Sequence, residues 1–323
     1  MTFSRPAPSS SERKNLVMVR AGRASQHMSY CRDRERENFD VGISWYDEGT
    51  AADFGMADGA LFVHDGWGAT ALEGNVLMQA ECRELFERYD YVCFMDDDMV
   101  GDAAGVSRMF DSCRRLGLDI AQPAIVARED SFNNHPITAV HTGFSVRFTN
   151  HVEPNAVVMS ARVLQRLVSL QVGAASAYGV EAAWRHMVKL GTMAIIDDAA
   201  MIHSRPAGRL GFAPEGADAA RRNMISYSIT GSPLYLTYGG FTTDGGFVAM
   251  GRGEPHGSRK VLELLERAAP EILASLHQLD PEVARVRVGK YLSGNRDFVA
   301  SDPGHKHVGS ILRDHLAATG INV

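Results

Sequence analysis

The stretch Tyr91-Val92-Cys93-Phe94-Met95-Asp96-Asp97-Asp98 decides the fold prediction for this chain of 323 residues. An apolar run that ends abruptly in acids is typical of a buried strand in a parallel sheet. In open α/β sheets, ligands bind at the carboxyl ends of the strands. Because adjacent carboxylates repel one another unless a cation lies between them, the triplet predicts a metal site.

The spacing of the triplet indicates which acids share the ion. Side chains at positions i and i+2 of an extended chain lie on one face, so Asp96 and Asp98 can address the same cation. Mg²⁺ and Mn²⁺ prefer hard oxygen ligands, and either is the expected cofactor. The alternative is an acidic turn before the helix that we expect at 102–116. Its N-cap would be Asp102, which leaves the triplet itself unexplained.

The composition is that of a soluble globular protein, with 45% hydrophobic and 22% charged residues. A net charge of −6 argues against a nucleic-acid partner. No apolar stretch approaches the roughly 20 residues of a transmembrane segment. Residues 1–13 lack the apolar core of a signal peptide, so we expect a disordered tail and a cytoplasmic protein. The cysteines lack metal-type spacing and are expected to be reduced thiols: Cys31, Cys82, Cys93 and Cys113.

The first half of the chain alternates strand and helix patterns, which predicts parallel strands with helices on both faces of the sheet. The expected strand ends would gather along one rim at Arg20, Asp47, His64 and Asp96. The expected strands are 15–20, 39–45, 60–63, 91–95 and 119–123, and the expected helices are 71–88 and 102–116.

The second half is less regular. A strand is expected at 155–159, helices from Ser160 and from about Gly179, and a further strand at 193–196. Asp197 and Asp198 are interpreted as a turn. The glycine-rich residues 206–257 are expected to form long loops. The end is expected to be helical again, punctuated at Pro270 and closing over 311–318.

Three common enzyme motifs do not occur in the sequence. There is no GxxxxGK[ST] phosphate loop, which argues against an NTPase. No GxGxxG follows the first strand, and no GxSxG nucleophile elbow occurs. A transferase acting on a nucleotide sugar remains as the interpretation of acids at a strand end.

An ordered set of segments resembles the DUF707 family, whose members are similar to glycosyltransferases of the GT-A type with a DxD motif. The segments are 15–19, 59–64, 89–98, 118–124, 178–181 and 195–203, so the resemblance covers about residues 14–212. Beyond about Leu210 the resemblance ends. It implies a GT-A-like (Rossmann-like) α/β domain with a mainly parallel mixed sheet at 14–212, and a loop-rich, helical extension at 213–323.

The resemblance also assigns roles at the metal site. It implies that Asp98 binds the ion, that Asp96 shares the ion or reaches the ribose, and that His203 completes the site. The alternative role for His203 is a hydrogen-bonded histidine at a strand end. Asp97 is expected to turn away. A divalent cation there would stabilise the negative charge that develops on a departing diphosphate.

Glu181 is the candidate general base, taking a proton from an acceptor hydroxyl and giving inversion at the sugar. The family more often has Asp at this position. The alternative role is an acid that stabilises the start of a helix, and we expect the helix dipole to lower its pKa.

Four further residues are candidate nucleotide contacts. They are Arg20, Arg23, Ser25 and Asp47. For the first three, a solvated polar loop is the commoner role of such residues, and for Asp47 a turn acid is an equally good interpretation. Trp67 can stack on a base or sugar, or it is a surface residue without a functional role. His141 can border the acceptor site. Trp184 is expected in the core.

The predicted function is therefore a metal-dependent glycosyltransferase. It would move a sugar from a nucleotide-diphosphate sugar, a UDP-sugar in particular, to the hydroxyl of a saccharide or another acceptor. Two alternatives remain open: a nucleotidyltransferase that makes a nucleotide sugar, and a non-catalytic nucleotide-sugar-binding protein. Release of pyrophosphate would distinguish the first of these.

Overall fold

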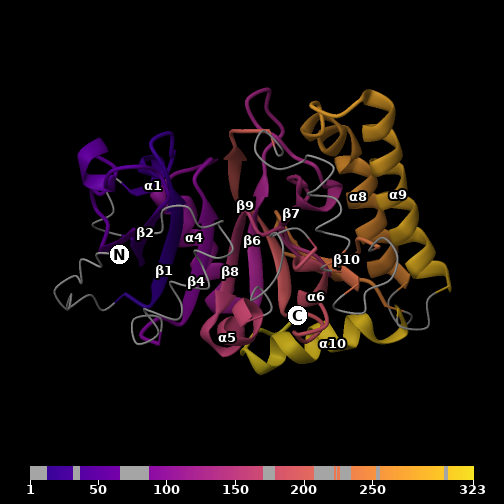
Figure 1. Ribbon diagram of the computed structural model, residues 1–323. Coiled ribbons are helices and arrows are strands. Elements are labelled where there is room, and N and C mark those ends of the chain that lie inside the picture. The colour runs from indigo at the N-terminus through magenta and orange to yellow at the C-terminus, as the bar shows by residue number, and fades with distance from the viewer. Residues whose placement is uncertain are drawn as a thin grey trace.

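The computed structural model describes residues 13–31, 37–65, 87–169, 179–206, 222, 224–225, 234–251, 255–301 and 305–323. The expected helix at 71–88, Trp67 and Cys82 lie outside the described residues. Figure 1 shows one large sheet flanked by helices. The predicted α/β fold, a mixed sheet flanked by helices, is therefore confirmed.

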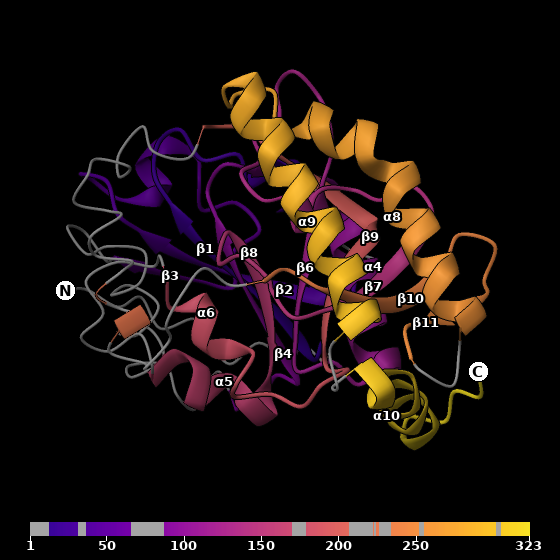
Figure 2. The ribbon, with the colours of Figure 1, turned by 90° about the vertical axis from the view of Figure 1, so that its right-hand side faces the viewer.

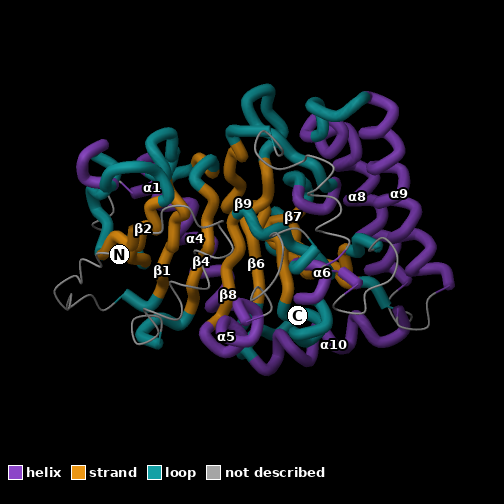
Figure 3. Tube along the Cα trace, in the orientation of Figure 1, coloured by secondary structure: helices purple, strands orange, loops and turns teal. Residues whose placement is uncertain are grey.

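The sheet has eleven strands among the described residues, in the order β11-β10-β7-β9-β6-β8-β4-β1-β2-β3, with β5 paired to β9. Figure 3 shows these strands crossing the molecule, with α8 and α9 beyond one end of the row. The strands are β1 (Asn15–Ala21), β2 (Phe39–Trp45), β3 (Phe62–Asp65), β4 (Tyr91–Asp96), β5 (Met99–Val100), β6 (Ile120–Ile125), β7 (Phe144–Thr149), β8 (Ala156–Ser160), β9 (Met193–His203), β10 (Thr237–Thr242) and β11 (Phe247–Ala249).

The parallel strands β3, β2, β1 and β4 form one half of the sheet. Every residue of β1 and β2 is buried, as continuous apolar runs in a covered parallel sheet require. The register places Arg20 beside both Ser44 and Asp96, and Ser44 beside His64. The expected rim of strand ends is thus formed, with Asp96 at the end of the rim next to β8.

Two expectations for the second half were wrong. Asp197 and Asp198 do not form a turn, because β9 continues without interruption to His203. Residues 206–257 are not all loop, because β10 and β11 extend the sheet. Gly240 lies in β10 where an added Cβ would meet the carbonyl oxygen of Val146 at 2.0 Å, so its glycine serves close strand packing.

The helices cover the two faces of the sheet. Figure 2 shows α5 (Ala161–Ser169) and α6 (Glu181–Trp184) on one side, and α4 (Ala103–Leu116) and α8 (Pro255–Ser275) on the other. The remaining helical segments of the described residues are α1 (Met28–Cys31), η1 (Ala51–Phe54), η2 (Pro136–Thr138), α9 (Pro281–Ser301) and α10 (His305–Ala318). Within the described part of the chain, no helix has both the length and the apolar character that a bilayer crossing requires.

Local sequence explains both ends of α4, whereas packing outweighs the helix-breaking tendency of a proline in α8. Asp102 caps α4 by accepting a hydrogen bond from the Gly105 N–H, and Gly117 ends that helix at a φ of 59°. Pro270 does not punctuate the C-terminal helix but lies inside α8. The buried stripe of α8 that includes Val261 and Leu265 packs into the main core and outweighs the backbone hydrogen bond that proline removes.

A buried ion pair links β7 to β9. Arg147 and Asp197 form two hydrogen bonds of 2.8 and 3.0 Å and are almost fully enclosed. The Arg147 guanidinium also donates to the carbonyl oxygens of Ile137 and Ala139. His141 lies against this group, in a T-shaped ring contact with Tyr291 of α9. His141 therefore belongs to the interior, which argues against the predicted place at the acceptor edge.

The core matches the expectations for individual residues. Trp184 is fully buried and packs in the core with α5. Cys93 and Cys113 are buried free thiols, and Cys31 is also buried.

Candidate functional site

The aspartate triplet lies in the turn between β4 and β5. Asp96 is the last residue of β4, and Asp97 and Asp98 form the turn. The antiparallel pairing of β5 with the end of β9 places Met99 opposite His203. The Nε2 atom of His203 consequently lies 3.4 Å from Oδ2 of Asp98. The sequence predicted that these residues meet, but not the short strand that brings them together.

The carboxylate of Asp97 is bound by two other side chains. The Tyr46 hydroxyl donates to Asp97 Oδ2 at 2.5 Å, and the Arg205 guanidinium binds Asp97 Oδ1. Arg205 also approaches Asp98, with its Nε atom 3.6 Å from Oδ2. Tyr46 and Arg205 were missed in the sequence, although Tyr46 follows β2 by one residue and Arg205 follows His203 by two.

The charges of this site depend on one another. Burial raises the pKa of Asp96, and the charge of Asp98 raises it further. Burial alone would lower the pKa of His203, but its hydrogen bond to Asp98 and the charge of that carboxylate raise it. The other ring nitrogen of His203 is 2.8 Å from the Phe132 carbonyl oxygen, to which it donates. The closely spaced carboxylates therefore favour the binding of a proton or a cation at this site.

The residues present are chemically suited to a divalent cation. Asp98 Oδ1 is buried and has no hydrogen-bond partner among the described residues. Carboxylate oxygens and an imidazole are ligands that Mn²⁺ accepts. Over the same residues, however, no three His, Cys, Asp or Glu side chains are arranged as a metal group. Asp98 Oδ2 faces His203 and Arg205 instead, so metal binding requires these contacts to rearrange.

Of the predicted nucleotide contacts, Arg20 pairs with Asp96 across β1 and β4. It is buried beside Asp96, donates to Ser44 Oγ at 2.6 Å and stacks on the Tyr46 ring, with 5.3 Å between its Cζ atom and the ring centroid. The Arg23 N–H donates to Asp47 Oδ2 at 2.8 Å. The structure thus brings Arg23 and Asp47 together above the rim.

Ser25 points elsewhere. Its hydroxyl is buried and lies 2.6 Å from Nδ1 of His27, which turns it toward the interior of this loop. The Nε2 atom of His27 lies 2.9 Å from the Met56 carbonyl oxygen. The site therefore gathers Arg20 with Asp96, while the role predicted for Ser25 would require its contact with His27 to break.

Glu181 is the first residue of α6 and one of its carboxylate oxygens is buried. This atom, Oε2, has no hydrogen-bond partner among the described residues. Burial raises the pKa of Glu181 to about 7, with a contribution from the charge of Glu153. The expectation that the helix dipole lowers this pKa was wrong. A helix of four residues has little dipole, and desolvation of the carboxylate outweighs it.

The surroundings of Glu181 were not predicted from the sequence. Glu153 Oε1 is 3.3 Å from His135 Nε2, and Glu153 Oε2 accepts a hydrogen bond from Thr138. The segment that carries Glu153 also touches the triplet, because the Asn155 carbonyl accepts the Asp96 N–H at 2.8 Å. One short segment therefore connects the carboxylates near Glu181 to those at the end of β4.

No family model and no curated protein matches the sequence. Among solved structures, the chain is similar to S. aureus TarS 1–349 in complex with UDP-GlcNAc, at 10% identity and a TM-score of 0.47, covering 88% of this chain and 91% of that one. Against the longer TarS structure the identity is 9% and the TM-score 0.42, and the same 88% of this chain spans 55% of that chain. A197 from STIV is similar over 59% of this chain and 94% of its own, at 10% identity and a TM-score of 0.33. These likenesses are distant, and they assign neither a substrate nor a metal to this chain.

Proposed function

We propose that this chain is a glycosyltransferase that transfers a sugar from a nucleotide-diphosphate sugar, a UDP-sugar in particular, to an acceptor hydroxyl. The proposal includes the DUF707-like, GT-A-type relationship that its ordered motifs suggest. The observation that carries it is the carboxyl end of β4, where Asp98, two residues after Asp96, lies against His203 and keeps a buried oxygen without a partner among the described residues. An acidic cluster at this edge of an α/β sheet suits a cation-bridged diphosphate.

The donor end of the site combines acidic and basic groups. Asp96, Asp98 and His203 would hold Mn²⁺ or Mg²⁺, which supplies a positive charge to the departing diphosphate. Arg205 has a side chain 32% exposed and already bridges Asp97 and Asp98. Its guanidinium is free to exchange a carboxylate for a phosphate oxygen, since both suit the same planar donor pattern.

Glu181 is proposed as the general base. Its carboxylate takes the proton of the acceptor hydroxyl as the hydroxyl oxygen bonds to the anomeric carbon. The bond from that carbon to the diphosphate oxygen breaks, and the diphosphate leaves with the electron pair. A single displacement of this kind inverts the anomeric centre. A pKa near 7 suits a group that must be ionised before transfer and protonated after it.

The experiment is a product assay on purified protein with Mn²⁺, a panel of UDP-sugars and simple saccharide acceptors. We expect UDP release that depends on the acceptor, together with a glycosylated product by mass spectrometry. Glu181→Gln should abolish release while donor binding is kept. Release of pyrophosphate from UTP and a sugar phosphate, without transfer from any UDP-sugar, would instead identify a nucleotidyltransferase.

A further inference from the structure

A pocket of about 300 Å³ lies at the edge of the sheet opposite to the aspartate triplet. Thr149, the last residue of β7, and Met193, the first residue of β9, both line it. The triplet meets the other end of β9, at His203. The length of β9 therefore separates this pocket from the proposed donor site.

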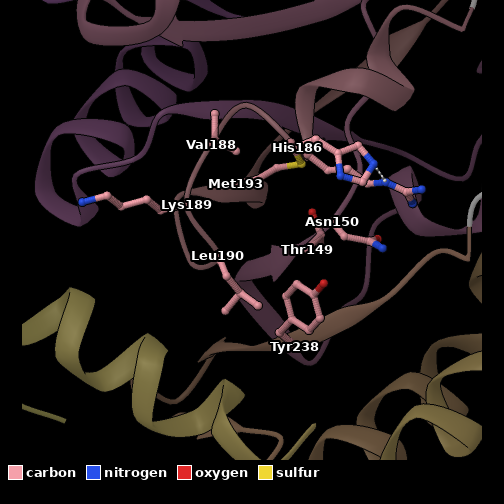
Figure 4. Close-up of a pocket in the computed structure, with 9 residues that line it drawn as sticks. Thr149, Asn150, His186, Val188, Lys189, Leu190, Met193 and Tyr238 are labelled. Carbon is pink, nitrogen blue, oxygen red and sulfur yellow. Dashed lines mark hydrogen bonds between the residues drawn. The ribbon is translucent and has the colours of Figure 1, made fainter. Parts of the chain in front are cut away.

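The polar lining of the pocket is basic or neutral. The described lining residues include Arg185, His186 and Lys189, and no acid is among them. Figure 4 shows His186 and Asn150 on the same side of the pocket, with the Tyr238 hydroxyl directed toward them. The Lys189 ammonium points away from this group. The other permanently charged cation in the lining is Arg185.

Arg185 has no carboxylate partner within the described part of the chain. Its Nε atom donates to His186 Nε2 at 3.1 Å, and both terminal nitrogens of the guanidinium remain for a ligand. The planar guanidinium offers two parallel N–H donors, which match the oxygens of a carboxylate or a phosphate. An arginine that lines a pocket with no acid in its lining is suited to an anion from outside.

The contact with Arg185 also determines which ring nitrogen of a neutral His186 carries the proton. Since Nε2 accepts a hydrogen bond, a neutral imidazole carries its proton on Nδ1 and can donate from that side. Burial and the charge of Arg185 both lower the pKa of His186, which keeps the ring neutral. The pair therefore offers a cationic fork and a neutral donor next to each other.

We propose that this pocket binds an oxyanion group, a phosphate or a carboxylate, held by Arg185 with His186 as a second donor. The site is independent of the proposed transferase reaction, because none of its residues belongs to the donor site or to the proposed base. Arg185 nevertheless follows Glu181 by four residues and caps the end of the same helix, α6. An anion bound there would lie on the element that carries Glu181.

The probe is inorganic phosphate, titrated into the full chain at low ionic strength by calorimetry. Arg185→Gln should weaken phosphate binding at least about tenfold, since the charge-assisted bidentate contact is lost. The matched control is Arg285→Gln, which removes an exposed arginine paired with Glu282 and should bind phosphate as the wild type does. Binding of a UDP-sugar should be the same in both variants.

A second measurement uses the wild-type chain and does not depend on how a variant folds. Phosphate should slow the modification of Arg185 by phenylglyoxal, followed by mass spectrometry, and leave the rate at Arg285 unchanged. Equal rates at Arg185 with and without phosphate, unaltered phosphate binding in Arg185→Gln, or loss of UDP-sugar binding in that variant would each overturn the proposal.

Discussion

Glu181 shows at the scale of one residue how burial changes the chemistry of a carboxyl group. Its pKa of about 7 lies well above the ordinary value of 4.5, because one carboxylate oxygen is desolvated and Glu153 adds a like charge. A base must be ionised to accept a proton, so transfer should accelerate as the pH rises through about 7. We expect the pH profile of UDP release to show this rise, with Glu181→Gln inactive at every pH.

The matched control for this profile is Glu282→Gln, since Glu282 is an exposed acid on α9. It should reproduce the wild-type rate and profile. A wild-type profile that is already flat from pH 5 upward, or appreciable transfer by Glu181→Gln, would rule out Glu181 as the base.

The same shift predicts an effect on stability. A carboxyl group whose pKa is raised by folding binds its proton more tightly in the folded state. The free energy of unfolding therefore falls as the pH rises from about 4.5 to about 7 and stays lower above that range. At pH 8 the ionised, buried Glu181 lowers the free energy of unfolding by on the order of 2 kcal/mol, after allowance for partial exposure.

Glu181→Gln has no such titration. Urea unfolding at pH 5 and pH 8 should show that this variant loses less stability with rising pH than the wild type does, by on the order of 2 kcal/mol. Parallel pH dependence of the two proteins would contradict the burial assigned to the carboxylate.

At the scale of elements, one glycine of β10 and one of α9 allow a comparison of the same substitution, glycine to alanine, in a crowded and in an open place. A Cβ at Gly240 would lie 2.0 Å from the Val146 carbonyl oxygen, whereas one at Gly289 would meet nothing within 4 Å. Gly240→Ala should therefore destabilise the chain by about 2 kcal/mol or more, since backbone must move. Gly289→Ala, inside a helix, should stabilise it by about 0.5–1 kcal/mol. Urea unfolding measures both, and equal midpoints would contradict the close approach of β10 to β7.

The buried pair Arg147–Asp197 holds β7 against β9, two strands that are far apart in sequence. Asp197→Asn leaves a buried guanidinium without its counter-ion, which should cost about 3–5 kcal/mol. Arg285→Gln breaks an exposed ion pair on α9 and should cost less than about 1 kcal/mol. The comparison is again made by urea unfolding, where a cost below about 1 kcal/mol for Asp197→Asn would show that the pair is not enclosed.

At the scale of the whole molecule, the sequence predicted what local pattern controls. Apolar runs such as 91–95 and the cap at Asp102 depend on neighbouring residues, and the strand, the helix and the shared rim follow from them. What was missed depends on chain segments that meet only in the fold. The pairing of β5 with β9 and the contacts of Arg205 are examples.

The misplaced loops at 206–257 have the same origin. Glycines predict turns in isolation, but in β10 they allow close backbone packing against β7. The raised pKa of Glu181 could not be foreseen either, since burial is a property of the packed chain. Local acids at a strand end were thus sufficient to locate a candidate site, and insufficient to describe its electrostatics.

The measurement that tests the central claim most directly is calorimetric binding of a UDP-sugar panel with and without Mn²⁺, in the wild type and in Asp98→Asn. The control is Asp102→Asn, the same substitution four residues later, at a cap that asparagine also fills. The account predicts Mn²⁺-dependent binding in the wild type and the control, weakened at least about tenfold in Asp98→Asn. Binding that is independent of Mn²⁺ and equal in all three proteins would contradict it.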